Sequence, residues 1–91
     1  MDKKNNTKGP QKPTFALFLS SLGMQAMIAL GKIENPLTKK TEKNHNQASF
    51  LIDTLEIIKE KTKNNLSKDE EKLLDEYLFN LKMIYAKAIK E

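Results

Sequence analysis

Large apolar side chains fall into three segments of the chain, separated by two polar connections. The first segment, residues 15–30, is an apolar run that only four small or polar residues interrupt. The second and third, about 45–63 and 68–90, repeat apolar residues every three or four positions, which is the period of an amphipathic helix. No segment alternates with period two for long, so the pattern predicts an all-α protein with three helices.

Residues that commonly cap helices stand at the start of each segment. Thr14 and Asn44 occupy the positions expected for N-caps of the first two helices. Ser67 is followed three residues later by Glu70, which is the pattern of a capping box. Each helix therefore has a local signal for where it begins.

The ends of the first two helices are marked as well. Gly31 and Asn64 follow them, and both residue types tolerate a left-handed backbone. The connection 32–43 is polar and contains a turn signal at Asn35-Pro36. Residues 64–67 leave room only for a tight loop, which predicts an antiparallel hairpin of the second and third helices.

The second and third helices each place most of their apolar residues on one face, with two apolar residues opposite. The predicted core faces are Ala48, Leu51, Ile52, Leu55, Ile58 and Thr62 in the second helix, and Leu73, Leu74, Tyr77, Leu78, Leu81, Ile84, Tyr85, Ala88 and Ile89 in the third. Phe50 and Ile57 lie opposite the first set, and Phe79 and Met83 lie opposite the second. We expect these four residues to form a secondary docking surface.

The first helix has almost no polar face, so it must be buried all round. Two further helices cannot cover it completely in one copy, and homodimerisation is the commonest way to supply the missing surface. Ala16, Ser20 and Gly23 align as a groove of small residues that a partner helix could approach closely. The expected self-association residues are Phe15, Ala16, Phe18, Leu19, Ser20, Leu22, Gly23 and Met27.

The same apolar run has three other interpretations: a membrane anchor, a signal peptide and a helix that lies on a membrane surface. A helix of this length spans about 24 Å, which is short of a hydrocarbon core of ~30 Å. The small residues that a signal-peptide cleavage site needs are poorly placed. A buried helix is therefore favoured, and we expect a cytoplasmic protein.

Positive charge is concentrated at the start of the chain. The 16 basic residues are all Lys and exceed the 12 acidic ones, but residues 1–13 alone contribute +3 of the net +4. We expect these residues to form a disordered Lys-rich arm, followed by a single domain at 14–91. The helical segments are nearly neutral and contain no Arg, which disfavours nucleic acid as a partner. An unknown protein partner or a membrane surface stays open.

The composition removes most catalytic chemistry. With no Cys and a single His, thiol chemistry and zinc sites of the usual ligand sets are excluded. His45 is expected to be a surface residue in the first turn of its helix. We therefore expect no enzyme activity, no catalytic or metal-binding residues and no cofactor. One question stays open, which is whether Gln25, Asp53, Thr54 and Tyr85 meet in a polar site.

Several short motifs resemble one known family. They are Leu19-Ser20-Ser21, Gln25-Ala26, Leu30-Gly31, Asn35-Pro36, Ile52-Asp53-Thr54-Leu55, Glu60-Lys61-Thr62-Lys63, Asn65-Leu66-Ser67, Glu70-Glu71, Leu74 and Tyr85. Over about residues 14 to 86 the chain resembles the bacterial family known as domain of unknown function 1844. Two positions depart from its pattern: Asn64 stands where glycine is usual, and Lys82 where arginine is usual. The resemblance implies a small helical bacterial protein and brings no catalytic residues.

These observations predict a non-enzymatic protein–protein interaction module that self-associates, as a dimer, through its first helix. The alternative is a peripheral membrane protein that uses the Lys-rich arm and the apolar first helix. In that case the arm would be attracted to anionic lipid and the first helix would leave the bundle.

Overall fold

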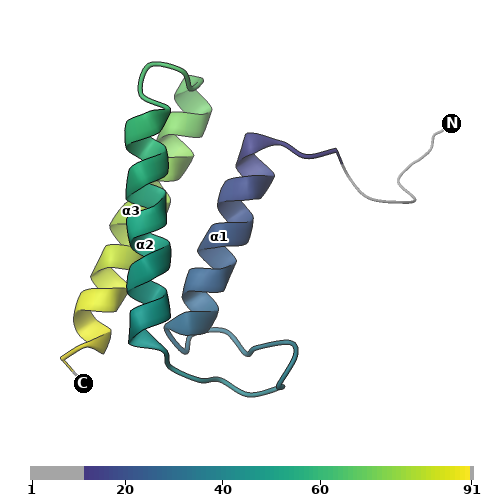
Figure 1. Cartoon of the computed structure of the whole chain (residues 1–91), viewed down its shortest axis with the longest axis vertical. Coiled ribbons are helices and arrows are strands. Elements are labelled where there is room, and N and C mark those ends of the chain that lie inside the picture. The colour runs from purple at the N-terminus through teal and green to yellow at the C-terminus, as the bar shows by residue number, and fades with distance from the viewer. Residues whose placement is uncertain (1–11, 91) are drawn as a thin grey trace, which may run out of the picture.

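The computed structural model describes residues 12–90 and contains three α-helices (Figure 1). They are α1 (Phe15–Ala29), α2 (His45–Lys61) and α3 (Lys68–Ala88). The described part of the chain has no β-strand, and the all-α class is confirmed. Each helix begins at the expected residue and ends one or two residues earlier than expected. The predicted Lys-rich arm falls almost entirely on residues 1–11, outside the described part.

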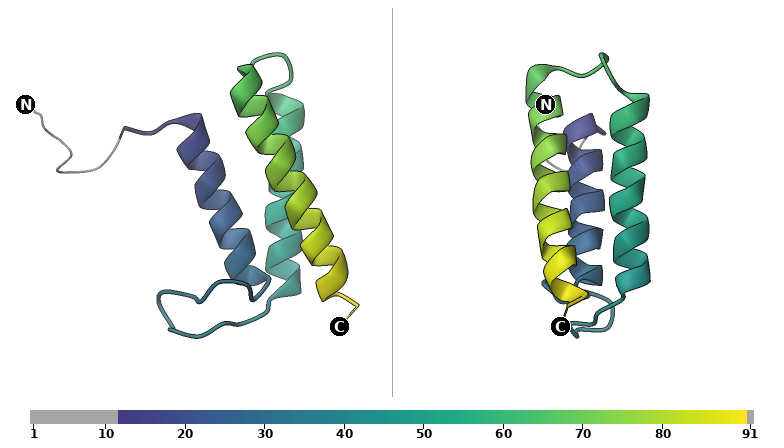
Figure 2. Two further views of the ribbon diagram at one scale, coloured as in Figure 1. Left: turned by 180° about the vertical axis from the view of Figure 1, so that it is seen from behind. Right: turned by 90° about the vertical axis from the view of Figure 1, so that its left-hand side faces the viewer.

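The three helices lie side by side, and each contacts the other two (Figures 1 and 2). Figure 2 shows α1 lying over the groove between α2 and α3, so that one side of α1 faces away from both. Residues 62–67 connect α2 to α3 at the far end from the α1–α2 connection. Two ion pairs, Lys59–Asp75 and Glu56–Lys82, join α2 to α3, and their order shows that the two helices run in opposite directions.

The core consists of the inward faces of all three helices. Its buried apolar residues are Leu19, Ala26, Ala29, Leu30, Ala48, Leu51, Ile52, Leu55, Leu74, Leu78, Leu81 and Ala88. In α2 and α3 these residues belong to the faces that the helical period predicts. The helical period also places Ile89 on the core face of the third helix. In the structure α3 ends at Ala88, and Ile89 is 53% exposed. The placement of Ile89 in the core is therefore wrong.

The predicted N-caps are present and satisfy backbone N–H groups that the first turn leaves free. Thr14 Oγ1 accepts from Leu17 N–H, and Asn44 Oδ1 accepts from Gln47 N–H, both at 3.0 Å. At α3 the capping box is complete. Ser67 Oγ accepts from Glu70 N–H at 3.1 Å, while Ser67 N–H donates to Glu70 Oε1 at 2.9 Å.

The left-handed positions expected after α1 and α2 are also present. Gly31 has a φ of 78° and Asn64 a φ of 69°. A third residue, Lys39, has a φ of 63°, which the sequence pattern does not indicate. It lies in the connection between α1 and α2, which we call the 31–44 loop.

The 31–44 loop is an ordered turn that projects past α1. Asn35 and Lys40 face each other in an isolated antiparallel bridge, and Asn35 Oδ1 accepts from Leu37 N–H at 2.9 Å. Both views from the side show the loop extending beyond α1, away from α2 and α3 (Figures 1 and 2). The sequence predicts a turn at Asn35-Pro36, but only the structure shows the direction in which the loop projects.

Candidate interaction surface

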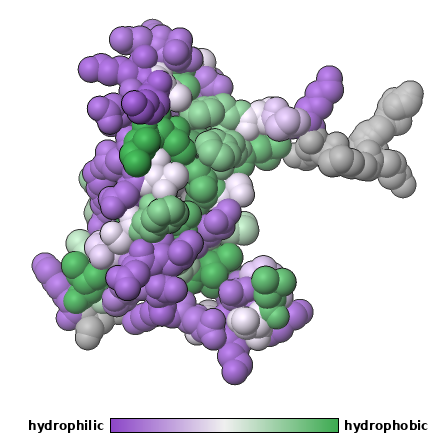
Figure 3. Space-filling model, in the orientation of Figure 1, coloured by the Kyte–Doolittle hydropathy of each residue, from purple (hydrophilic) through white to green (hydrophobic). Residues whose placement is uncertain are grey.

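α1 contains no charged residue, and folding leaves part of its apolar surface in contact with solvent. Leu17 is 43% exposed, Phe18 is 49% exposed and Met24 is 57% exposed. In Figure 3, hydrophobic surface gathers over α1 and along its border with α2, whereas the loop between α2 and α3 is hydrophilic. The fold of one copy does not explain this uncharged and exposed side of α1.

Four residues on the side of α1 away from the core follow a regular spacing. Leu17, Ser21, Met24 and Ile28 are separated by four, three and four positions, so they lie along one side of the helix. We call this set the outer face of α1. Leu17, Ser21 and Met24 are exposed, and Ile28 is half-buried. Spacing of this kind is typical of helices that pack lengthwise against another helix.

The structure divides the eight residues expected to mediate self-association into three groups. Leu19 and Gly23 are buried within the chain. Phe15, Leu22 and Met27 are half-buried and pack against the core. Ala16, Phe18 and Ser20 are exposed.

The groove of small residues on α1 is occupied by a side chain of the same chain. A Cβ atom at Gly23 would lie 2.7 Å from Tyr77 Cε1, so the aromatic ring takes the space that glycine leaves. Tyr77 Oη also donates to Ser20 Oγ at 3.0 Å. The close approach expected at Gly23 is therefore made by α3 within one copy.

Leu17 and Met24 are absent from the predicted set, although they are among the exposed apolar residues of α1. Their spacing of seven residues, on the side of the helix opposite Leu19 and Ala26, is a signal present in the sequence. The prediction instead followed the small residues, which identify the side where α1 approaches α3.

The four residues of the expected secondary docking surface are all exposed, as their positions opposite the core predict. Phe50 and Ile57 on α2 are 65% and 55% exposed, and Phe79 and Met83 on α3 are 65% and 53% exposed. Met83 borders an apolar hollow together with Met27, Tyr77, Asn80, Leu81 and Ile84. Phe79 instead lies among polar and charged residues of α3. The two α3 residues therefore border different surroundings.

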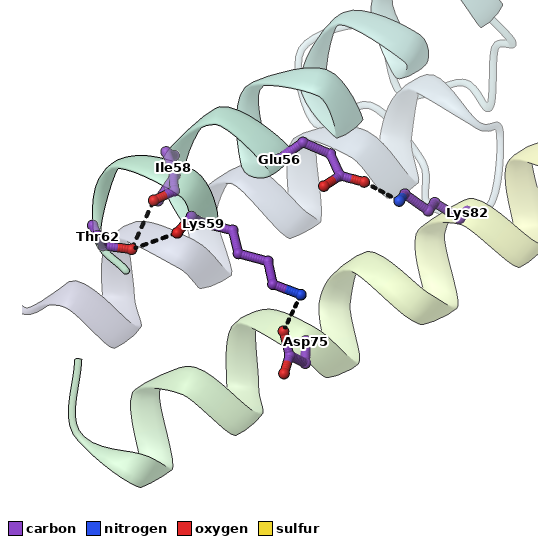
Figure 4. A network of polar contacts seen from close by, with 6 residues as sticks. All are labelled: Glu56, Ile58, Lys59, Thr62, Asp75 and Lys82. Carbon is purple, nitrogen blue, oxygen red and sulfur yellow. Dashed lines mark hydrogen bonds and ion pairs between the residues drawn. The ribbon is translucent and has the colours of Figure 1, made fainter. Parts of the chain in front are cut away.

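Polar contacts hold α2 and α3 together along their solvent side (Figure 4). Lys59 Nζ lies 2.9 Å from Asp75 Oδ1, and Lys82 Nζ pairs with a Glu56 carboxylate oxygen. The Lys59 and Asp75 side chains are about half exposed, so water screens this interaction. Glu56, Lys59 and Asp75 also line a hollow between α2 and α3, together with Glu60, Thr62, Lys63, Leu66, Glu71 and Leu74.

The described residues contain no group of three or more His, Asp or Glu side chains that could hold a metal ion. His45 is half-buried rather than a surface residue: its ring lies edge-on to Tyr85, and its Nε2 is buried with no hydrogen-bond partner in the described structure. The placement of His45 at the surface is therefore wrong.

The four residues whose convergence was left open have separate surroundings. Gln25 borders a shallow hollow with residues of the 31–44 loop, such as Asn35 and Glu42. Thr54 uses its hydroxyl group to donate to Phe50 O in its own helix. Asp53 is exposed, and the ring of Tyr85 packs edge-on against His45.

Across residues 12–90, no helix combines the length and the apolar character needed to cross a bilayer. α1, the most apolar of the three, has 15 residues.

A family model described as a domain of unknown function, DUF1844, matches residues 12–87. This range includes all of α1 and α2 and nearly all of α3. No curated protein matches the chain significantly. No solved structure does so either.

Proposed function

The chain belongs to the DUF1844 family, and we propose that this member is a non-enzymatic protein–protein interaction module that self-associates. The observation that supports the proposal most directly is the outer face of α1. After folding, Leu17 and Met24 on this face and the adjoining Phe18 still expose about half of their surface. Contact with another apolar surface would remove them from water, which is the main driving force for association.

A second copy of the same helix suits this face better than a charged partner. Because α1 carries no charged residue, it offers nothing for a charged surface to pair with, and a desolvated partner charge would be costly. Two identical uncharged faces can meet without leaving a charge unpaired and without removing a charge from water. A two-fold dimer uses the same patch on both copies, so a single face is sufficient.

The expected strength of such a contact is modest. Complete burial of a Leu, Phe or Met side chain contributes about 1.5–3 kcal/mol, and these three are already half-buried. Six such side chains in a dimer would contribute about 6 kcal/mol, which is comparable to the cost of association. We therefore expect a reversible dimer whose population depends on concentration.

The proposal is tested by sedimentation equilibrium of the wild-type chain over a wide concentration range. We expect a monomer–dimer equilibrium. The double variant Leu17→Lys/Met24→Lys should remain monomeric, because it places two like charges on each of the facing surfaces. Circular dichroism should show unchanged helix content, since both side chains are exposed.

The matched control is Phe79→Lys/Met83→Lys, which introduces the same charges at two exposed apolar positions of α3. This control should dimerise like the wild type. A wild-type chain that stays monomeric throughout would contradict self-association. Loss of the dimer in the α3 variant alone would place the interface on α3 instead of α1.

A further inference from the structure

The 31–44 loop has a position and a shape that the fold of one copy does not require. Both of its ends are held at the same end of the bundle, because Asn44 N–H donates to Ala29 O at 2.8 Å. Within the loop, Asn35 N–H donates to Lys40 O at 2.8 Å, and Lys39 N–H donates to Asn35 O at 2.7 Å. The loop is thus an ordered projection beside the C-terminal end of α1.

This projection carries an apolar side chain that makes almost no contact with its own chain. Leu37 is 90% exposed, more than any other large apolar residue in the described part of the protein. It lies between the bridged residues Asn35 and Lys40, at the turn of the loop. Single exposed apolar side chains are common on protein surfaces, so Leu37 supports an interface only through its position on a hydrogen-bonded turn beside the outer face of α1.

The loop extends on the same side of α1 as the solvent-facing surface of that helix, away from α2 and α3 (Figures 1 and 2). The loop therefore projects at an angle from the outer face of α1, at the C-terminal end of that helix. A helix that packs along the outer face would meet the loop at one of its ends.

We infer that a second copy packs antiparallel along the outer face of α1, and that the 31–44 loop of each copy contacts the N-terminal half of α1 in the other through Leu37. This inference rests on the proposed self-association and adds its geometry. Each loop stands at the C-terminal end of its own α1. In an antiparallel pair this position is beside the N-terminal end of the partner's α1.

A parallel arrangement conflicts with the position of the loops. Both loops would then project toward the partner at the same end of the dimer, where they would compete for the same space. The antiparallel arrangement places one loop at each end. Two-fold symmetry then makes both contacts identical.

The spacing of the outer face also suits the antiparallel arrangement. With Leu17 of one copy opposite Ile28 of the other, Ser21 falls opposite Met24. A small side chain then faces a long one at each inner position. In a parallel pair Met24 would face Met24 and Ser21 would face Ser21, which alternates crowding with empty space.

The absence of cysteine from the chain permits a clean crosslinking test. Leu17→Cys and a size-tagged Leu37→Cys variant are mixed under mild oxidation and separated on a non-reducing gel. We expect the mixed disulfide between the two variants to dominate. Crosslinking through two Leu17→Cys copies would show a parallel pair, and failure of any mixed species to form would remove the loop from the interface.

A second measurement does not depend on disulfide geometry. Leu37→Ser should weaken dimerisation by about tenfold for each of the two symmetric contacts, because each leucine loses its apolar burial. Ile89→Ser, at a half-exposed position after the end of α3, is the control and should leave the dissociation constant unchanged. A dimer that Leu37→Ser leaves intact would overturn this inference while the proposed function stands, whereas a monomeric wild-type chain would overturn both.

Discussion

At the scale of single residues, Gly23 shows how one position can be explained in two ways. A glycine within an apolar helix indicates that something approaches the backbone closely. The sequence pattern suggested a helix of another copy, whereas the structure shows the ring of Tyr77 from the same chain. Gly23 therefore serves the α1–α3 contact of one copy.

A substitution at Gly23 should accordingly lower the stability of the fold. We expect Gly23→Leu to reduce the free energy of unfolding by about 2 kcal/mol, as overpacking of a filled site does. Urea denaturation measures the change. The reason is specific, because a side chain at this position and the Tyr77 ring cannot occupy the same space.

The Tyr77→Ala background provides the control for this prediction. Without the ring, Gly23→Leu should cost little, and the better helix propensity of leucine favours it by a fraction of a kcal/mol up to about 1 kcal/mol. An equal cost in both backgrounds would show that Tyr77 is not the reason for the glycine. Such a coupling between neighbours is what a double-mutant cycle measures.

At the scale of elements, the three helices differ in what orients them. α2 and α3 each have a distinct apolar face, and ion pairs on their solvent side add to the contact between them. α1 has no charged side chain, so no ion pair can fix its rotation. Its orientation depends on contacts such as the packing of Gly23 against the Tyr77 ring and the hydrogen bond from Tyr77 to Ser20.

The ion pair between Lys59 and Asp75 should make a small, salt-dependent contribution. We expect the reversal Lys59→Asp to destabilise the protein by less than about 1 kcal/mol, since both side chains are half exposed. The double variant Lys59→Asp/Asp75→Lys should recover most of that loss. Both effects should shrink in 1 M salt, where the screening length falls to about 3 Å.

Lys61→Asp is the matched control, because Lys59 and Lys61 both lie in the last turn of α2 and complement its dipole equally. Urea midpoints of the variants separate the two effects. If Asp75→Lys rescued Lys61→Asp as well as it rescued Lys59→Asp, the contribution would come from overall charge and not from the pair.

At the scale of the whole molecule, the apolar surface exceeds what one copy can bury. Three helices around a small core leave nine large apolar side chains of the described residues exposed, and three of these lie on the uncharged helix α1. The proposed dimer would cover the α1 residues and Leu37 together. It would also couple folding to association.

This coupling predicts that thermal stability depends on protein concentration. For a chain of this length, we expect the unfolding midpoint to rise by about 3 °C or more for each tenfold increase in concentration, because only the folded state dimerises. Differential scanning calorimetry measures it. The Leu17→Lys/Met24→Lys variant should show no such dependence, and a constant midpoint in the wild type would argue against the dimer.

The sequence by itself determined the features that depend on neighbouring residues in the chain. The positions of the three helices follow from the helical period, and their starts follow from side chains such as Thr14 and Ser67, which bond to their own first turn. The left-handed backbone at Asn64 follows from residue type. The core faces of α2 and α3 could be predicted because polar residues mark the opposite side.

Only the tertiary structure decided the features that lack such a local signal. A helix that is apolar all round has no polar side to show which way it faces, so the rotation of α1 depends on its contacts with α2 and α3. For that reason Gly23 lies against Tyr77, and Leu17 and Met24 face solvent. The direction of the 31–44 loop is also a product of packing, because the contacts that set it join residues at the two ends of the loop.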